Sequence, residues 1–194
     1  MNINNEQLDA IKEIFNIGVG KGAQVLSQLL ESHIQLEVPD IRIYKYDDLE
    51  ILVKKIGAKN LSSVKMNFEG SYNGTVALSF ESETAINMIS VLIEEDPEKV
   101  ELDSVGTGTL CEVGNMIINS LMGSITNILE GEVQYSLPEY TDKSLQTVLD
   151  LYENVNNVII VADTLMTIEK LHASGKLLVV FKVGYLEQLL KAIE

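Results

Sequence analysis

Apolar residues recur at helical spacing over two long stretches of the chain, and shorter apolar segments follow each stretch. The first stretch includes residues 8–20, and the second surrounds Glu112. Residues three and four apart share one face of a helix, whereas short apolar runs bounded by turn residues are typical of strands. Each half of the chain is therefore predicted to form a long helix, a strand, a short helix, a hairpin and a closing helix.

An internal repeat relates the two halves at an offset of 99 residues. The segment EIFNIGVGKGAQVLSQLLESHIQLEVP in the first half aligns with EVGNMIINSLMGSITNILEGEVQYSLP in the second. The identical aligned pairs include Glu13 with Glu112, Asn16 with Asn115 and Pro39 with Pro138. Downstream, each half continues with two apolar strands, and we expect a turn at Gly74 in the first hairpin and at Gly175 in the second.

The acidic, proline-bearing segment 94–104 joins the two halves and suits solvent better than a core. As separate domains, the halves would each own a three-stranded sheet with an exposed edge and a thin core. Pairing them about a pseudo-twofold axis removes both weaknesses. We therefore predict a single α+β domain over residues 1–194, built from repeats at about 1–94 and 103–194. Its six-stranded, largely antiparallel sheet would carry both long helices on one face.

The first long helix carries a polar stripe. At about 100° per residue, Asp9, Glu13, Asn16 and Gly20 fall within roughly 60° of one another. We expect this stripe to face outward, because the opposite side gathers the apolar residues that a sheet would bury. Those residues are Leu8, Ile11, Ile14, Phe15, Val25, Leu26 and Leu29.

The second long helix repeats the stripe with Glu112, Asn115 and Asn119, and Gly108 stands where the first helix has an acid. An acid and an amide on one outer face are ordinary solvated residues when they occur once. Their return after 99 residues, among neighbours that differ, indicates a functional requirement.

Three glycines in the first helix need an explanation, because each costs about 1 kcal/mol relative to alanine in a helix interior. Gly18 and Gly22 lie away from the polar stripe, and we expect them to permit tight packing inside the fold. Gly20 lies on the stripe, where it would let the backbone of a partner approach Asn16.

Composition narrows the function. The formal charge of -15 and the 14 Lys and Arg residues argue against nucleic-acid binding and favour a protein partner. Cys111 has no second cysteine to pair with, and no apolar run is long enough to suggest a membrane span, so we expect a cytoplasmic protein. No nucleotide-binding or metal-ligand motif occurs, and His33 and His172 are predicted to be surface or strand-end residues.

The pattern acid-x-x-x-Glu-x-x-Asn-x-x-x-Gly, present twice in about two hundred residues, resembles the CheC family of chemotaxis phosphatases. The stretch DAIKEIFNIGVG fits the motif at every defining position from Asp9 to Gly20. The second motif keeps Glu112 and Asn115 but has Gly108 in place of Asp or Ser, and Asn119 in place of glycine. These departures leave open whether the second site is active.

The resemblance implies hydrolysis of the phosphoaspartate on a CheY-like response regulator. In such a reaction Asn16 and Asn115 would orient the attacking water, while Glu13 and Glu112 would dock on the active-site lysine of the regulator. Asp9 and Gly20 would contact the partner. The regulator would supply Mg²⁺, so no cofactor or metal of the chain itself is expected.

Two other interpretations stay open. In one, the chain acts without catalysis, as a sink for phosphorylated regulator or as an adaptor for the receptor deamidase CheD, which CheC-like proteins bind. In the other, it is the phosphatase-like part of a flagellar switch protein of the FliY type. The relative CheX carries one motif and dimerises, so two motifs in one chain favour CheC.

Overall fold

The structure is a computed structural model that describes all residues except 1–2, 46–47, 57–59, 149–156, 170 and 194. The first repeat contains α1 (Asn5–Leu29), β1 (Ile34–Lys45), α2 (Leu49–Ile56), β2 (Leu61–Gly70), β3 (Gly74–Phe80) and α3 (Ser82–Leu92). A short 3₁₀ turn, η2 (Pro97–Lys99), lies between the repeats. The second repeat contains α4 (Ser104–Ile128), β4 (Val133–Tyr135), β5 (Glu139–Lys143), α5 (Leu145–Val148), β6 (Asn157–Ile168), β7 (Leu171–Lys182) and α6 (Val183–Ala192).

The two long helices begin at equivalent side-chain caps, 99 residues apart. Asn4 Oδ1 accepts a hydrogen bond from the Gln7 N–H at the start of α1. Asp103 Oδ1 accepts from the N–H groups of Val105 and Gly106 at the start of α4. Such caps satisfy donors that the first turn of a helix leaves without partners, and they fix where the helix begins.

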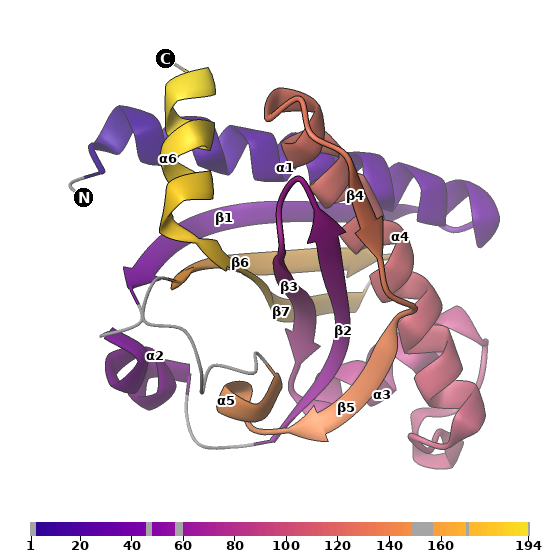
Figure 1. Cartoon of the computed structure of the whole chain (residues 1–194). Helices are drawn as coiled ribbons and strands as arrows, with labels where there is room; N and C mark the ends of the chain where they lie inside the picture. Colours follow the sequence, from indigo (N-terminus) through magenta and orange to yellow (C-terminus); the bar gives the residue numbers. More distant parts are fainter. Residues whose placement is uncertain (1–2, 46–47, 57–59, 149–156, 170, 194) are drawn as a thin grey trace.

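Within the described residues, seven strands form one sheet in the order β1-β6-β7-β3-β2, with β4 and β5 both pairing with β2 at the far edge (Figure 1). All of the described pairings are antiparallel. The central strands β3 and β7 pair symmetrically, since Gly74 stands opposite Phe181 and Phe80 opposite Gly175. This register matches the predicted pseudo-twofold relation between the repeats.

The edge strands are exchanged between the repeats. β1 of the first repeat pairs with β6 of the second, and β4 and β5 of the second pair with β2 of the first. Each repeat therefore completes the sheet of the other, which supports the prediction of a single domain. The α+β class and the largely antiparallel sheet are confirmed.

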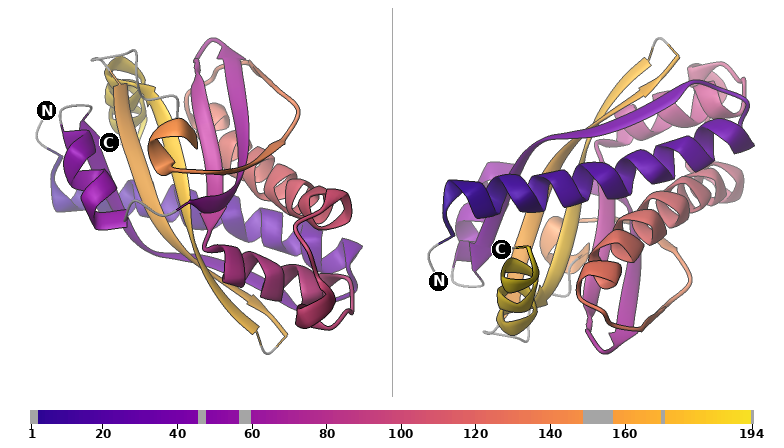
Figure 2. Two further views of the ribbon diagram at one scale, coloured as in Figure 1. Left: turned by 90° about the horizontal axis from the view of Figure 1, so that it is seen from below. Right: turned by 90° about the horizontal axis from the view of Figure 1, so that it is seen from above.

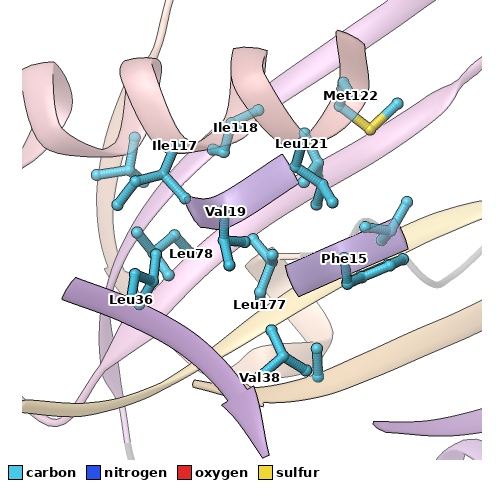
Figure 3. Packing of buried hydrophobic residues seen from close by; sticks show 14 of the residues in the cluster. Phe15, Val19, Leu36, Val38, Leu78, Ile117, Ile118, Leu121, Met122 and Leu177 are labelled. Atoms are coloured by element: carbon cyan, nitrogen blue, oxygen red, sulfur yellow. The ribbon is translucent and has the colours of Figure 1, made fainter. Parts of the chain in front are cut away.

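Both long helices lie on one face of the sheet, and α2 and α5 lie on the other (Figures 1 and 2). The larger core is enclosed between the sheet and the long helices, where Phe15 and Val19 of α1 pack near Leu121 of α4 and Leu177 of β7 (Figure 3). A smaller core on the opposite face contains Leu52 from α2. Burial of these apolar side chains is the main term that stabilises the layered arrangement.

The packing of α1 on α4 confirms the predicted roles of two glycines. A Cβ atom added to Gly18 would lie 2.7 Å from the Leu121 Cα, and one added to Gly22 would lie 2.9 Å from the Ile117 Cα. Nothing lies within 4 Å of a Cβ at Gly20. α1 and α4 can approach this closely because Gly18 and Gly22 place no side chain between them. Gly20 faces away from α4 and leaves open space on the outer side of α1.

The predicted number of six strands is wrong by one, because the edge strand of the second repeat is broken. β1 runs without interruption past Pro39, whereas β4 and β5 are separated at residues 136–138, around the equivalent Pro138. Proline has no N–H for a sheet hydrogen bond and favours bulges and strand ends. Three residues at the break stand opposite two on β2, since Tyr135 pairs with Phe68 and Glu139 with Lys65.

The predicted apolar face of α1 is wrong at its C-terminal end. Val25 and Leu29 are 47% and 61% exposed, although they were expected to be buried. Leu29 lies on the same side of the helix as the fully buried Ile11, but Leu26 is the last buried residue of α1. The final turn therefore extends beyond the core.

The predicted turn at Gly175 is also wrong. Gly175 lies inside β7, and the chain turns earlier, between Ile168 and Leu171. A Cβ atom at Gly175 would lie 2.5 Å from the ring of Phe80 on the neighbouring strand. The glycine is needed for the close approach of an aromatic ring from the other repeat, not for a turn.

Candidate functional site

The polar stripe of α1 faces outward, as predicted. Asp9, Glu13 and Gly20 are exposed, and Asn16 between them is half-buried. On α4, Glu112 and Gly108 are exposed and Asn115 is half-buried. Each long helix therefore presents a carboxylate and an amide one turn apart on its outer side.

The Asn16 side chain is hydrogen-bonded to the backbone of β1, which the sequence did not predict. The Val38 N–H donates to Asn16 Oδ1 (2.8 Å), and Asn16 Nδ2 donates to the carbonyl oxygens of Val38 (3.1 Å) and Lys12 (3.1 Å). The amide thus pairs with both backbone groups of one strand residue.

A β-bulge explains why Val38 needs this partner. In the β1–β6 register, Glu37 pairs with Leu165 and Asp40 with Asp163, so Val38 and Pro39 together stand opposite one residue. A bulge interrupts the ladder of backbone hydrogen bonds, and buried backbone groups require other partners. Val38 is buried, so water cannot supply these partners, and the Asn16 side chain supplies them instead.

The equivalent amide on α4 makes a different contact. Asn119 Nδ2 donates to Asn115 Oδ1 (2.8 Å), from the position that Gly20 occupies in the first repeat. Within the part of the chain that the structure describes, no group accepts a hydrogen bond from Asn115 Nδ2. The second motif therefore holds its amide with a neighbouring side chain on the same helix, not with a strand.

Ser136, not Asn115, bonds to two backbone groups at the second bulge. The Asn67 N–H donates to Ser136 Oγ (3.0 Å), and Ser136 Oγ donates to the Leu137 carbonyl (3.0 Å). Leu137, the counterpart of Val38, is 88% exposed, whereas Val38 is 1% exposed. The strand segment beside the second motif has therefore turned away from the core.

A groove extends from each motif between its long helix and the following strand. One of about 670 Å³ includes Gly20 and lies between α1 and β1. The other, of about 870 Å³, includes Asn119 and lies between α4 and β4. The first is lined by three glutamines and one carboxylate, namely Gln24, Gln28, Gln35 and Glu37. The second contains the carboxylates Glu69 and Glu132. The internal repeat in the sequence indicates that the two grooves are equivalent. The sequence alone does not predict the grooves, because they form only where β1 and β4 lie beside the long helices.

Cys111 lies directly before Glu112 and is half-buried, with its Sγ 3.9 Å from the Pro138 carbonyl oxygen. Burial raises the pKa of the thiol, and the nearby Glu112 and Glu139 carboxylates raise it further, against the opposing effect of a hydrogen bond with the Tyr140 backbone. The thiol is therefore held neutral, which argues against a role as a nucleophile.

The described part of the chain shows neither a metal site nor a membrane-spanning helix. No group of three or more His, Cys, Asp or Glu side chains there is arranged to hold a metal ion. No described helix has the length and apolar character needed to cross a membrane. His33 and His172 are exposed, as predicted.

Comparison with known proteins identifies the class to which this fold and these motifs belong. The model of the family "Chemotaxis phosphatase CheX" matches residues 62–162, which is 101 of the 194 residues. The model of the CheC-like family matches residues 6–43, which include the first motif. The chain therefore belongs to the chemotaxis phosphatase CheX family, and its first motif lies in a segment that matches the CheC-like family.

One curated relative is the CheY-P phosphatase CheC of Bacillus subtilis, with 28% identity over 142 residues. The match covers 71% of this chain and 66% of that protein, just under two thirds of its length. The FliY structure from Thermotoga maritima matches with a TM-score of 0.77 and 22% identity, covering 100% of this chain and 98% of that one. The FliM middle domain from Helicobacter pylori matches with a TM-score of 0.65 and 15% identity, covering 98% and 99%. These structural matches show the shared fold.

Proposed function

We propose that this chain is a phosphatase that hydrolyses the phosphoaspartate of a CheY-like response regulator. The observation that carries the proposal is the repeated carboxylate and amide pair, one helical turn apart on the outer side of both α1 and α4. The relative named CheY-P phosphatase CheC supports the choice of substrate. Asn16 or Asn115 would orient the attacking water, and Glu13 or Glu112 would bind the lysine of the regulator.

The chemistry suits an amide. Phosphoryl transfer proceeds through a loose transition state with charge spread over the equatorial oxygens, so positioning and electrostatic compensation provide most of the catalysis. We expect the regulator to supply Mg²⁺ and a lysine, which leaves a fixed water as the missing part. An amide oxygen accepts a hydrogen bond from that water without adding negative charge beside the phosphoryl group.

The exposed residues of the stripe fit a docking role. Glu13 is exposed one turn from Asn16, and Glu112 is exposed one turn from Asn115, so each carboxylate can contact a partner beside its amide. The open space at Gly20 allows a partner backbone to come close, and Asp9 lies at the rim one turn away. The net charge of -15 would speed association with a basic surface, and added salt would weaken this effect.

A dephosphorylation assay tests the proposal. A CheY-like regulator labelled with radioactive acetyl phosphate is mixed with wild-type protein, with the double variant Asn16→Ala/Asn115→Ala, or with Asn127→Ala. Asn127 is a matched control, because it is an exposed asparagine on α4 outside both motifs. We expect the double variant to lose about 100-fold or more in acceleration, since positioning of the water is lost, while Asn127→Ala behaves as wild type. Unchanged turnover in the double variant would refute the catalytic proposal.

A non-catalytic sink for phosphorylated regulator is the second candidate, and the engagement of Asn16 with β1 favours it. Such a protein would bind the regulator through Glu13 and Glu112 and leave its turnover unchanged. A pull-down with Glu13→Ala/Glu112→Ala separates the two candidates, because lost binding without any change in turnover by the asparagine variants supports the sink. Binding to CheD stays a prediction.

A further inference from the structure

The two motifs have the same residues, yet their amides are used differently. We propose that the second motif, around Asn115, performs most of the phosphatase turnover, while Asn16 serves chiefly as a structural clamp on the β1 bulge. This inference rests on the proposed function and concerns which of its two sites works.

Most of the hydrogen-bonding capacity of the Asn16 side chain is already in use. An asparagine amide has two N–H donors and two acceptor lone pairs on its oxygen. Asn16 has both donors engaged, by Val38 and Lys12, and one lone pair engaged by the Val38 N–H. A single lone pair is left, so this amide cannot hold a water and also donate to a phosphoryl oxygen.

Releasing Asn16 would not solve this problem. If its side chain turned outward, the N–H and carbonyl of Val38 would lose their partners at a residue that is 1% exposed. An unpaired buried backbone group lowers the population of such a conformer by roughly tenfold or more. The outward conformer of Asn16 is therefore rare.

Asn115 has no such obligation, because the Ser136 hydroxyl group donates to the Leu137 carbonyl and the exposed Leu137 is open to solvent. Ser136 stands at the repeat position of Glu37, a side chain that has no hydroxyl. Among the described residues, only Asn119 bonds to the Asn115 amide, which leaves one lone pair of Oδ1 and both Nδ2 hydrogens for other partners. Asn115 can therefore bind water and a phosphoryl oxygen together. Asn119, which replaces the glycine of the motif, therefore leaves the Asn115 amide available to a partner.

Asn119 acts in this account as a positioning residue. Its Nδ2 group holds Asn115 Oδ1 at 2.8 Å and restricts rotation of the amide. A catalytic group works best when its orientation is fixed before the substrate arrives. At the first site this position is Gly20, and β1 fixes the amide instead.

The experiment compares single variants in the labelled-regulator assay. We expect Asn115→Ala to lower kcat by about tenfold or more and Asn16→Ala by less than about threefold, with Asn127→Ala as the control. Folding of each variant is verified by circular dichroism. Asn16→Ala should also speed hydrogen exchange at the Val38 amide, a change that Asn115→Ala should not cause.

Each outcome is informative. If Asn115→Ala keeps more than half of the wild-type kcat, or if folded Asn16→Ala loses more turnover than Asn115→Ala, this inference is overturned while the proposed function stands. If the double variant is as active as wild type, the proposed function itself fails. The Asn115→Ala measurement remains decisive even if Asn16→Ala does not fold.

A separate readout tests Asn119. Asn119→Gly should lower kcat several-fold at unchanged KM, because the amide of Asn115 loses its fixed orientation but docking is preserved. Asn119→Ser retains a hydrogen-bonding group and should recover part of the loss. An unchanged kcat in Asn119→Gly, or a rise in KM alone, would contradict a positioning role.

Discussion

Each long helix is followed by a strand that lies beside it, and we call this pair of elements a corner. The α1–β1 corner and the α4–β4 corner share one sequence pattern but are held together by different contacts. In the first, the Asn16 side chain joins the helix to the strand, and the Ile34 N–H donates to Ser27 Oγ (3.0 Å) as a second link. In the second, Asn115 bonds to Asn119 of its own helix. Thr126, the counterpart of Ser27, interacts with the side chain of Tyr135 on β4 and not with the backbone of that strand.

The consequence is visible in the strands themselves. β1 is a continuous strand of 12 residues with a buried Val38, whereas its counterpart is divided into β4 and β5 of 3 and 5 residues, with an exposed Leu137. A repeated motif therefore need not perform the same task twice. One copy can stabilise the fold while the other keeps its polar groups available.

The largest effect is expected where the two repeats meet. Gly18→Val would force a side chain against the Leu121 Cα, 2.7 Å from the new Cβ, and should lower the free energy of unfolding by about 3 kcal/mol or more. Both corners should be lost together, since α1 and α4 share this contact. Gly20→Val is the matched control and should change stability by less than about 0.5 kcal/mol, because nothing lies near its Cβ. Urea denaturation measures both, and equal losses would show that the helix crossing does not depend on Gly18.

The two asparagines should differ next. Asn16→Ala leaves the Val38 N–H and carbonyl without partners and should cost about 2 to 3 kcal/mol of unfolding free energy. Asn115→Ala removes one hydrogen bond to a half-buried side chain and should cost about 1 kcal/mol or less. The comparison is made by urea denaturation with Asn127→Ala as reference. Similar losses for Asn16→Ala and Asn115→Ala would mean that the first corner is not clamped.

The residues beside the two amides provide a smaller contrast. Val38→Ser removes a buried side chain and should cost about 2 kcal/mol, whereas Leu137→Ser should change stability by less than about 0.5 kcal/mol. Thermal denaturation of the two variants is sufficient to compare them. A strong destabilisation by Leu137→Ser would show that the second strand packs on α4 in solution.

The smallest expected effect concerns Cys111, which contacts the broken strand. Burial and the nearby carboxylates raise the pKa of its thiol, so at about pH 8.5, where an ordinary cysteine is half ionised, the folded protein keeps less thiolate. Alkylation by iodoacetamide at this pH should be a few-fold slower than for free cysteine. Denaturing the protein in urea should remove the difference, and equally fast alkylation of the folded protein would contradict a neutral, half-buried thiol.

Much of the fold follows from the sequence alone. Apolar periodicity predicts both long helices, and the repeat predicts the pseudo-twofold relation, because both signals are local or depend on one fixed offset. The positions of Gly18 and Gly22 also predict tight packing of the first helix inside the fold. These features depend on residues that are near one another in the chain or repeated within it.

The remaining features depend on residues that the fold brings together from different repeats. The bulge at Val38 exists because β1 pairs with β6, more than a hundred residues away, so the sequence could not reveal what Asn16 would bind. Gly175 looked like a turn residue because the ring of Phe80, which requires the glycine, comes from the other repeat. The polar stripe was predicted correctly as an outer face, but its hydrogen bonds were not.

Hydrogen exchange at two backbone amides tests the central claim most directly. The Val38 N–H is bound by Asn16, whereas the Leu137 N–H has no acceptor among the described residues. We predict slow exchange at Val38, fast exchange at Leu137, and loss of the Val38 protection in Asn16→Ala under conditions where the protein remains folded. Equal exchange at the two amides in the wild-type protein would contradict the division of labour between the two motifs.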